Sequence, residues 1–154
     1  MHTATLTGSS FEDVDLSGVP DHLAFFSVAL AFSTGINCLA SAPLENALPL
    51  TFLCGQATEC ALKALLSKAG EPPKTLRSKD IRHNLTALWE LAASKASLQP
   101  SNPPVWIKQL AEVHASPYVL RYPMGVNMIA LPAPQPMLEG IKDLVAFTKA
   151  SLAA

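Results

Sequence analysis

The stretch that decides the fold is PLTFLCGQATECALKALLSKAG, residues 49–70. It is apolar nearly all round, which is typical of a helix in the middle of a helical bundle. Gly70 suits the residue just past the C-terminus of a helix, and Pro72 and Pro73 block its continuation. The stretch therefore predicts a long central helix over residues 49–69.

Four further helices are predicted from apolar periodicity and from proline and glycine breaks. They cover residues 22–42, 83–95, 104–114 and 135–152. Residues 116–136 are rich in proline and have no helical period, and their β-prone runs favour a small β-hairpin or an irregular insertion. The predicted fold class is therefore all-α, a bundle of about five helices with an insertion after the fourth.

The N-terminal residues differ from the rest of the chain in composition and periodicity. Residues 1–19 are rich in Ser, Thr and Gly without a sustained period, so we expect a flexible N-terminal arm. Asp21 suits the N-cap of the helix that follows. Residues 20–154 then form a single helical domain, as the chain length of 154 residues allows.

The composition is poor in charge. Charged residues make up 15% of the chain and hydrophobic residues 49%, whereas an average domain is about 25% charged. We therefore expect part of the apolar surface to meet a second subunit, in a homodimer packed through the first two helices or the proline-rich segment. The net charge of −1 excludes a strong global field for capturing nucleic acid.

Residues 23–44 carry no charge and are long enough to span a bilayer. Several polar residues interrupt them and no Lys or Arg flanks them, so we interpret them as a deeply buried core helix and expect no membrane association. No basic segment opens the chain as in a secretory signal, so we expect a cytoplasmic protein. The odd cysteine count without CxxC spacing indicates buried thiols in a reducing compartment, at Cys38, Cys54 and Cys60.

Two local motifs follow one another, ECALKALLSKAG at residues 59–70 and HNLTALWELA at residues 83–92. They resemble the pattern of HEPN domains, in which an acidic residue and an LKALL-like run on the second helix precede a Gly-His-Asp-Leu-like start of the next. Arg82 and Asn84 stand here where that pattern has Gly and Asp. In layout the resemblance extends over about residues 20–150.

The resemblance to HEPN domains implies a choice of functions. Many members are metal-independent ribonucleases that carry an Arg-x(4–6)-His motif and act as dimers. Many others are inactive, and some of these accompany a nucleotidyltransferase-like partner or bind nucleotides. We expect a binding or partner module, associated with a nucleotide or RNA and without its own catalysis, with a toxin–antitoxin ribonuclease as the alternative.

The ribonuclease alternative rests on RSKDIRH, where five residues separate Arg77 from His83. A histidine with a pKa near neutrality can take the proton of a ribose 2′-hydroxyl, and an arginine can stabilise the phosphate charge. The same residues allow a structural interpretation. His83 would then cap the helix that it precedes or hydrogen-bond to Glu59.

Polar side chains on the central helix mark a candidate ligand site. Gln56, Glu59 and Lys63 fall on one face, and the i, i+4 order of Glu59 and Lys63 favours an ion pair. This pair either fixes the packing register or forms, with His83, the floor of a polar pocket. Arg121 is the only charged residue from Ser116 to Met137, and we expect it to pair with a carboxylate such as Glu59 or to close over that pocket.

Cations gather between the second and third predicted helices. This basic segment can contact phosphates or remain a solvated loop, and it contains Lys74, Arg77, Lys79 and Arg82. His2, His22 and His114 have no partner at metal-ligand spacing in the sequence, and there is no glycine-rich phosphate loop. We therefore expect no metal and no cofactor.

Overall fold

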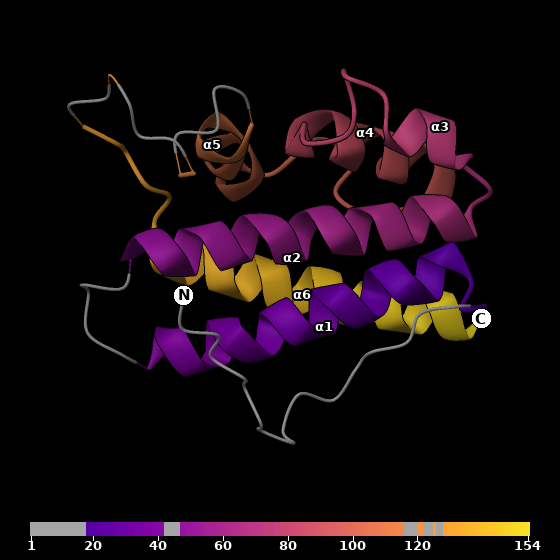
Figure 1. Ribbon diagram of the computed structural model, residues 1–154, viewed down its shortest axis with the longest axis horizontal. Helices are drawn as coiled ribbons and strands as arrows, with labels where there is room; N and C mark the ends of the chain where they lie inside the picture. Colours follow the sequence, from indigo (N-terminus) through magenta and orange to yellow (C-terminus); the bar gives the residue numbers. More distant parts are fainter. Residues whose placement is uncertain (1–17, 42–46, 116–119, 122–124, 126–127) are drawn as a thin grey trace, which may run out of the picture.

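The computed structural model describes residues 18–41, 47–115, 120–121, 125 and 128–154. These residues form six helices and no strand (Figure 1). The helices are α1 (Asp21–Ala40), α2 (Ala47–Lys68), α3 (Pro73–Leu76), α4 (Leu85–Ala96), α5 (Val105–His114) and α6 (Pro134–Ala153). The all-α class is confirmed. The ends of the five long helices lie within two residues of those predicted, and α3 is a short addition inside the basic segment.

The centre of the molecule is α2. It runs between α1 and α6 on one side and α4 and α5 on the other, and it contacts all four (Figure 1). Most of its length is buried, including the charged residues Glu59 and Lys63. The apolar sequence of residues 49–70 thus occupies the position predicted for it.

The C-terminus of α2 is closed by the predicted glycine. Gly70 has a φ of +89°, a conformation that favours glycine. Its N–H donates to the carbonyl of Ser67 at 3.1 Å, and the N–H of Glu71 donates to the carbonyl of Leu66 at 2.9 Å. This pair of hydrogen bonds is the Schellman motif, which ends the helix and turns the chain towards α3.

The prediction of a deeply buried first helix is wrong. Only Phe26, Ala29 and Ile36 of α1 are buried, while Leu23 and Leu30 are each more than 40% exposed. Because α1 lies at the edge of the bundle, it covers α2 and α6 with one side and leaves the other side open. An apolar composition shows that a helix is hydrophobic, but it does not show how many neighbours that helix has.

By length and composition alone, α1 could cross a membrane, with a mean hydropathy of 1.8 and 11% of the segment buried. A single helix of this kind near the N-terminus is weak evidence for a membrane protein. The N-cap of α1 is Pro20, whose carbonyl accepts hydrogen bonds from the N–H groups of Leu23 and Ala24. Asp21, predicted as the N-cap, is instead the first helical residue. There its negative charge interacts favourably with the positive end of the helix dipole.

Two predicted segments fall largely outside the described residues. The N-terminal arm of residues 1–19 is described only at Gly18 and Val19. Of the predicted insertion at residues 116–136, residues 128–133 have no regular secondary structure and α6 begins at Pro134. Most residues of the predicted hairpin runs are not among those described.

Tryptophan packing joins α4 to α5 and α5 to α6. Trp89 and Trp106 meet edge to face with ring centroids 6.0 Å apart, and the indole of Trp89 donates to the carbonyl of Pro100 at 2.8 Å. Gly140 of α6 lies directly against the Trp106 ring, where a Cβ atom would collide with it. These contacts hold α4 and α5 in place, and the histidines described next lie just before α4 and at the end of α5.

Candidate functional site

The most connected side chain on α2 is Glu59. Its Oε1 accepts a hydrogen bond from Lys63 Nζ at 2.6 Å. Its Oε2 lies 3.0 Å from His83 Nδ1 and 2.7 Å from His114 Nε2. Since an ionised carboxylate only accepts hydrogen bonds, both ring nitrogens donate to it. We call these four residues the Glu59 cluster.

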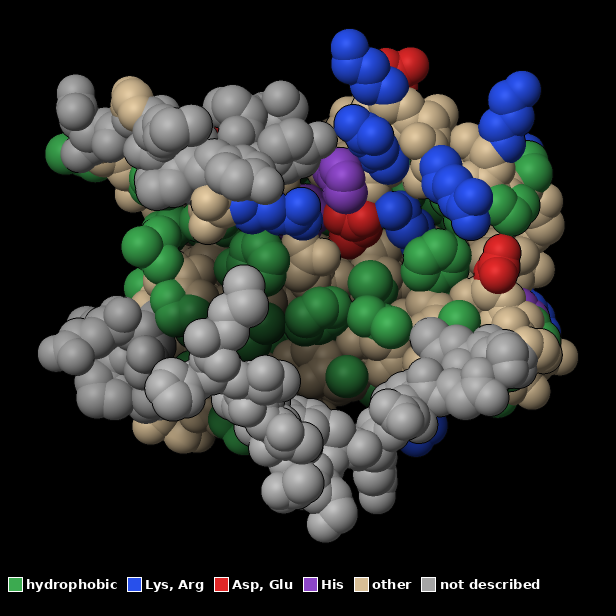
Figure 2. All heavy atoms as spheres, in the orientation of Figure 1, with side chains coloured by type: hydrophobic (Ala, Val, Ile, Leu, Met, Phe, Trp, Pro, Cys, Tyr) green, Lys and Arg blue, Asp and Glu red, His purple; other side chains and the backbone are tan. Residues whose placement is uncertain are grey.

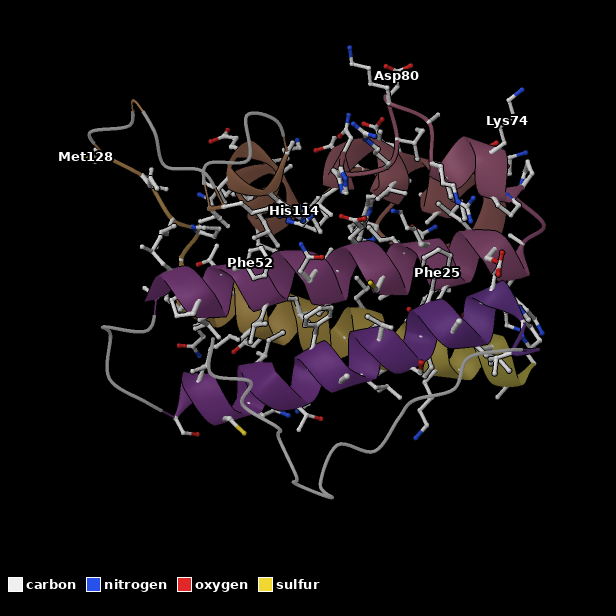
Figure 3. All side chains as sticks on the ribbon, viewed as in Figure 1. Phe25, Phe52, Lys74, Asp80, His114 and Met128 are labelled. Atoms are coloured by element: carbon white, nitrogen blue, oxygen red, sulfur yellow. The ribbon has the colours of Figure 1, made fainter. Side chains whose placement is uncertain are left out.

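Each member of the Glu59 cluster is placed by a different feature of the fold. Glu59 and Lys63 lie one turn apart on α2. His83 directly precedes Asn84, the N-cap of α4, whose side chain accepts a hydrogen bond from the N–H of Ala87. His114 is the last residue of α5 and lies against α2 (Figure 3). The fold therefore joins three segments of the chain at one carboxylate.

A glycine makes room for His114. Gly55 lies one turn before Glu59 on α2, and a Cβ atom at this position would collide with the His114 ring. The close approach lets His114, which is 3% exposed, reach Glu59 from α5. A mid-helix glycine ordinarily costs about 1 kcal/mol of helix stability relative to alanine, so its position here has a packing reason.

The Glu59 cluster keeps its carboxylate ionised. Burial by itself raises the pKa of Glu59. Three partners lower it by more, so that the pKa is about 2: the hydrogen bond from His114, the charge and hydrogen bond of Lys63, and the hydrogen bond from His83. Lys63 also lies 6.0 Å from the centroid of the Phe25 ring on α1. The buried anion is thus balanced by a cation that contacts both α2 and α1.

The cysteines do not offer a reactive thiol at this site. Burial raises the pKa of Cys54 to about 12. Burial and the charge of Glu59 raise the pKa of Cys60 to about 11, against the charge of Lys63. Cys38 is exposed on α1, contrary to the expectation that all three thiols are buried.

A cleft of about 580 Å³ opens beside the Glu59 cluster. His83 belongs to its wall, with Lys79 and Asp80 from the turn before α4 and Lys108 and Glu112 from α5. The side chain of His83 is 29% exposed, while those of Glu59 and His114 are almost completely buried. His83 therefore connects a buried polar cluster to solvent.

Cationic side chains gather on one part of the surface. Figure 2 shows Lys and Arg side chains gathered over α3 and the turn that follows it, whereas hydrophobic side chains predominate over α1. In the same view a histidine lies beside an acidic side chain, with Lys or Arg on both sides. Lys74 and Asp80 point outward from this part of the molecule (Figure 3).

The structure brings three of the five predicted ligand-binding residues together, namely Glu59, Lys63 and His83. Gln56 lies on the same side of α2, and its buried Nε2 has no hydrogen-bond partner among the described residues. Arg121 lies with its guanidinium 5.6 Å from the centroid of the Phe52 ring, two helical turns before Glu59. This contact places Arg121 against α2, and Arg121 is not among the residues that line the cleft beside His83.

The two predicted catalytic residues occupy different surroundings. Arg77 is exposed at the C-cap of α3, and within the described part of the chain its guanidinium forms no hydrogen bond or ion pair. His83 is oriented by Glu59. Of the structural interpretations given for His83, the hydrogen bond to Glu59 is correct, and Asn84 rather than His83 caps the helix.

Sequence reasoning missed His114. It has no partner at metal-ligand spacing in the sequence, but in the folded chain the atoms of Glu59, His83 and His114 that could hold a metal all lie within 4.8 Å of one another. Fifty-five residues separate His114 from Glu59, so local spacing could not connect them. A signal was nonetheless present: His114 continues the buried side of α5 formed by Trp106, Leu110 and Val113, where a polar side chain needs a partner.

No protein-family model, no curated protein and no solved structure matches the chain.

Proposed function

We propose that the chain is a HEPN-like binding module of the cytoplasm that holds a phosphate group of a nucleotide or RNA, without catalysis of its own. The observation that carries the proposal is the position of His83. Its ring lines the cleft with Lys79 and Lys108 and is anchored from behind by the buried carboxylate of Glu59. A fixed imidazole that lines a cleft together with two lysines is a suitable environment for an anionic ligand.

The dimensions and charges of the cleft support a small anionic ligand. A volume of about 580 Å³ falls within the usual range of ligand pockets. Asp80 and Glu112 line the same cleft, so its charge is mixed, and a ligand must offer hydrogen-bond donors as well as phosphate oxygens. A nucleotide meets both requirements, with its phosphate at the lysines and its base or ribose at the carboxylates.

The role of Glu59 favours binding over catalysis. Both of its oxygens are occupied by donors from Lys63, His83 and His114. A carboxylate held in this way orients its partners, and Glu59 is not among the residues that line the cleft. Arg77, the residue that would stabilise a transition state, lies exposed at the end of α3.

Binding of a fluorescently labelled ATP analogue and of a short labelled RNA, measured by anisotropy, tests the proposal. We expect the Lys79→Ala/Lys108→Ala variant to lose affinity by about tenfold for each lysine, because each removes a charge-assisted hydrogen bond. Lys149→Ala, an exposed lysine on α6, is the matched control and should bind normally. Absence of binding by the wild type, or equal affinity in both variants, would refute the proposal.

One observation favours a second function, a metal-independent ribonuclease. Glu59 holds the Nδ1 side of His83, an arrangement that orients an imidazole for proton transfer through Nε2. Arg77 would then act as the phosphate ligand in a dimer or on a bound RNA. Cleavage of RNA in EDTA that disappears in both the Arg77→Ala and His83→Ala variants would establish this function in place of the binding module.

We also propose that the chain forms a homodimer and acts beside a nucleotidyltransferase-type partner, as the resemblance to HEPN domains implies. The apolar open side of α1 supports the homodimer. Co-purification with a nucleotidyltransferase encoded next to this chain tests the partner. Failure of the two purified proteins to elute together would exclude it.

A further inference from the structure

We propose that Glu59, His83 and His114 form a binding site for one divalent transition-metal ion of the class of Zn²⁺. The expectation of no metal rested on sequence spacing, which does not bring these residues together. The fold does so from three elements, α2, the turn before α4 and the end of α5. Two imidazoles and one carboxylate are a ligand set found in zinc enzymes.

The distances require little rearrangement. Glu59 Oε2 lies 3.0 Å from His83 Nδ1 and 2.7 Å from His114 Nε2, and all three atoms lie within 4.8 Å of one another. Three ligands that hold one ion at about 2.1 Å are roughly 3 to 3.5 Å apart. Shifts of less than about 1 Å would therefore open the space now bridged by two hydrogen bonds.

The chemistry of the three ligands selects the kind of ion. Imidazole nitrogen binds zinc, nickel, cobalt and copper, whereas Mg²⁺ and Ca²⁺ favour sites made of oxygen ligands. Each ring nitrogen that now donates to Glu59 would bind the ion through its lone pair, with the ring proton on the opposite nitrogen. His83 would carry that proton on Nε2 and His114 on Nδ1.

Lys63 contacts the carboxylate ligand without being a ligand of the ion itself. Its ammonium group holds Glu59 Oε1 at 2.6 Å and leaves Oε2 as the single carboxylate ligand. This fixes the carboxylate orientation, as hydrogen bonds to ligands do in metal sites, and the positive charge weakens the affinity. We therefore expect a site of moderate affinity that favours the ions that bind imidazole most strongly.

His83 provides the route to solvent. It lines the cleft that also contains Lys79 and Lys108, so an ion can enter from there. The coordination position of the ion that no protein ligand fills would face the cleft. The inference goes beyond the proposed function, because the ion can bind whether or not a nucleotide or RNA does. A bound cation would, in addition, attract an anionic ligand to the same cleft.

The test uses the full chain freed of metal with EDTA and then dialysed. Zn²⁺ is titrated by calorimetry, and Co²⁺ is followed by its visible absorption, which reports four-coordinate geometry. We expect one ion for each chain, a rise in the thermal midpoint with Zn²⁺, and no such rise with Mg²⁺ or Ca²⁺. Absence of both the Zn²⁺ heat and the Co²⁺ absorption would overturn the proposal.

Two variants locate the ion without dismantling the bundle. In His114→Gln and in His83→Gln the new amide can still donate to Glu59, but it replaces a strong nitrogen ligand. We expect each to weaken Zn²⁺ binding by more than about 100-fold while the circular dichroism stays that of the wild type. His22→Gln, on α1, is the control and should bind normally. Unchanged binding in His83→Gln and His114→Gln would place the ion elsewhere and refute the site.

Discussion

At the scale of single residues, the carboxylate of Glu59 determines the polar interior of this molecule. The sequence could predict its pairing with Lys63, because both residues lie on α2 and helix geometry fixes their separation. It could also predict the contact with His83, which opens the HNLTALWELA run just before the next long helix. It could not predict the contact with His114, which depends on how α5 packs on α2.

The pKa of Glu59 predicts how stability depends on pH in the protein freed of metal. Its value falls from an ordinary 4.5 to about 2 in the folded chain. A lowered carboxyl pKa stabilises the fold above the pKa of the unfolded chain, and this stability is lost as the pH falls from 4.5 towards 2. The contribution at neutral pH is on the order of 3 kcal/mol.

Urea unfolding at a series of pH values measures this contribution. The Glu59→Gln variant should be less stable at neutral pH, because Lys63 is left buried without an anion, and it should lack this acid-dependent loss. Glu90→Gln, an exposed site on α4, is the control and should behave as the wild type. An acid dependence in Glu59→Gln equal to that of the wild type would contradict the assignment.

Thiol reactivity provides a second prediction at this scale. At about pH 8, a maleimide should modify exposed Cys38 rapidly and Cys54 slowly, because the thiolate is the reactive form and burial raises the pKa of Cys54 to about 12. Labelling followed by peptide mass spectrometry measures both rates. Cys38→Ser should remove the fast phase, and a fast phase that remains in this variant would show that a buried thiol is accessible.

At the scale of helices, proline and glycine allowed the boundaries to be predicted. Gly70 ends α2 with a positive φ, and Pro134 opens α6, so local chemistry was sufficient there. The burial of α1 could not be predicted, because its apolar residues face both α2 and open solvent. The sequence pattern of a segment indicates that the segment forms a helix, whereas the burial of that helix depends on neighbours that are distant in the sequence.

The contact between α2 and α5 predicts the effect of one methyl group. Gly55→Ala should lower the free energy of unfolding by about 1–3 kcal/mol, since the new Cβ collides with the His114 ring. Gly35→Ala on α1 is the matched control. Its Cβ meets only the flexible end of Leu53 at 3.1 Å, and alanine favours a helix by about 1 kcal/mol.

Chemical denaturation of the two variants compares them directly. Helix propensity acts in the same direction in both, so a lower stability of Gly55→Ala reports the α2–α5 contact. Equal stability of the two variants would mean that the His114 ring can move aside at little cost.

At the scale of the whole molecule, the open side of α1 predicts self-association. Leu23 and Leu30 lie two turns apart on this side and are 43% and 42% exposed. Light scattering should give the mass of two chains for the wild type and of one chain for Leu23→Asp/Leu30→Asp. Val105→Asp changes an exposed apolar residue on α5 and should leave the mass unchanged. A wild type with the mass of one chain would exclude the dimer.

The position of His83 couples the surface of the molecule to its interior. On one side the His83 ring lines the cleft, and on the other it contacts a carboxylate of α2 that also contacts His114 at the end of α5. A ligand that contacts His83 in the cleft would therefore change the stability of the packing around Glu59. By thermodynamic reciprocity, loosening of that packing would lower the affinity for the ligand. Substitutions far from the cleft, at the Trp89–Trp106 contact, should thus alter affinity without touching a ligand.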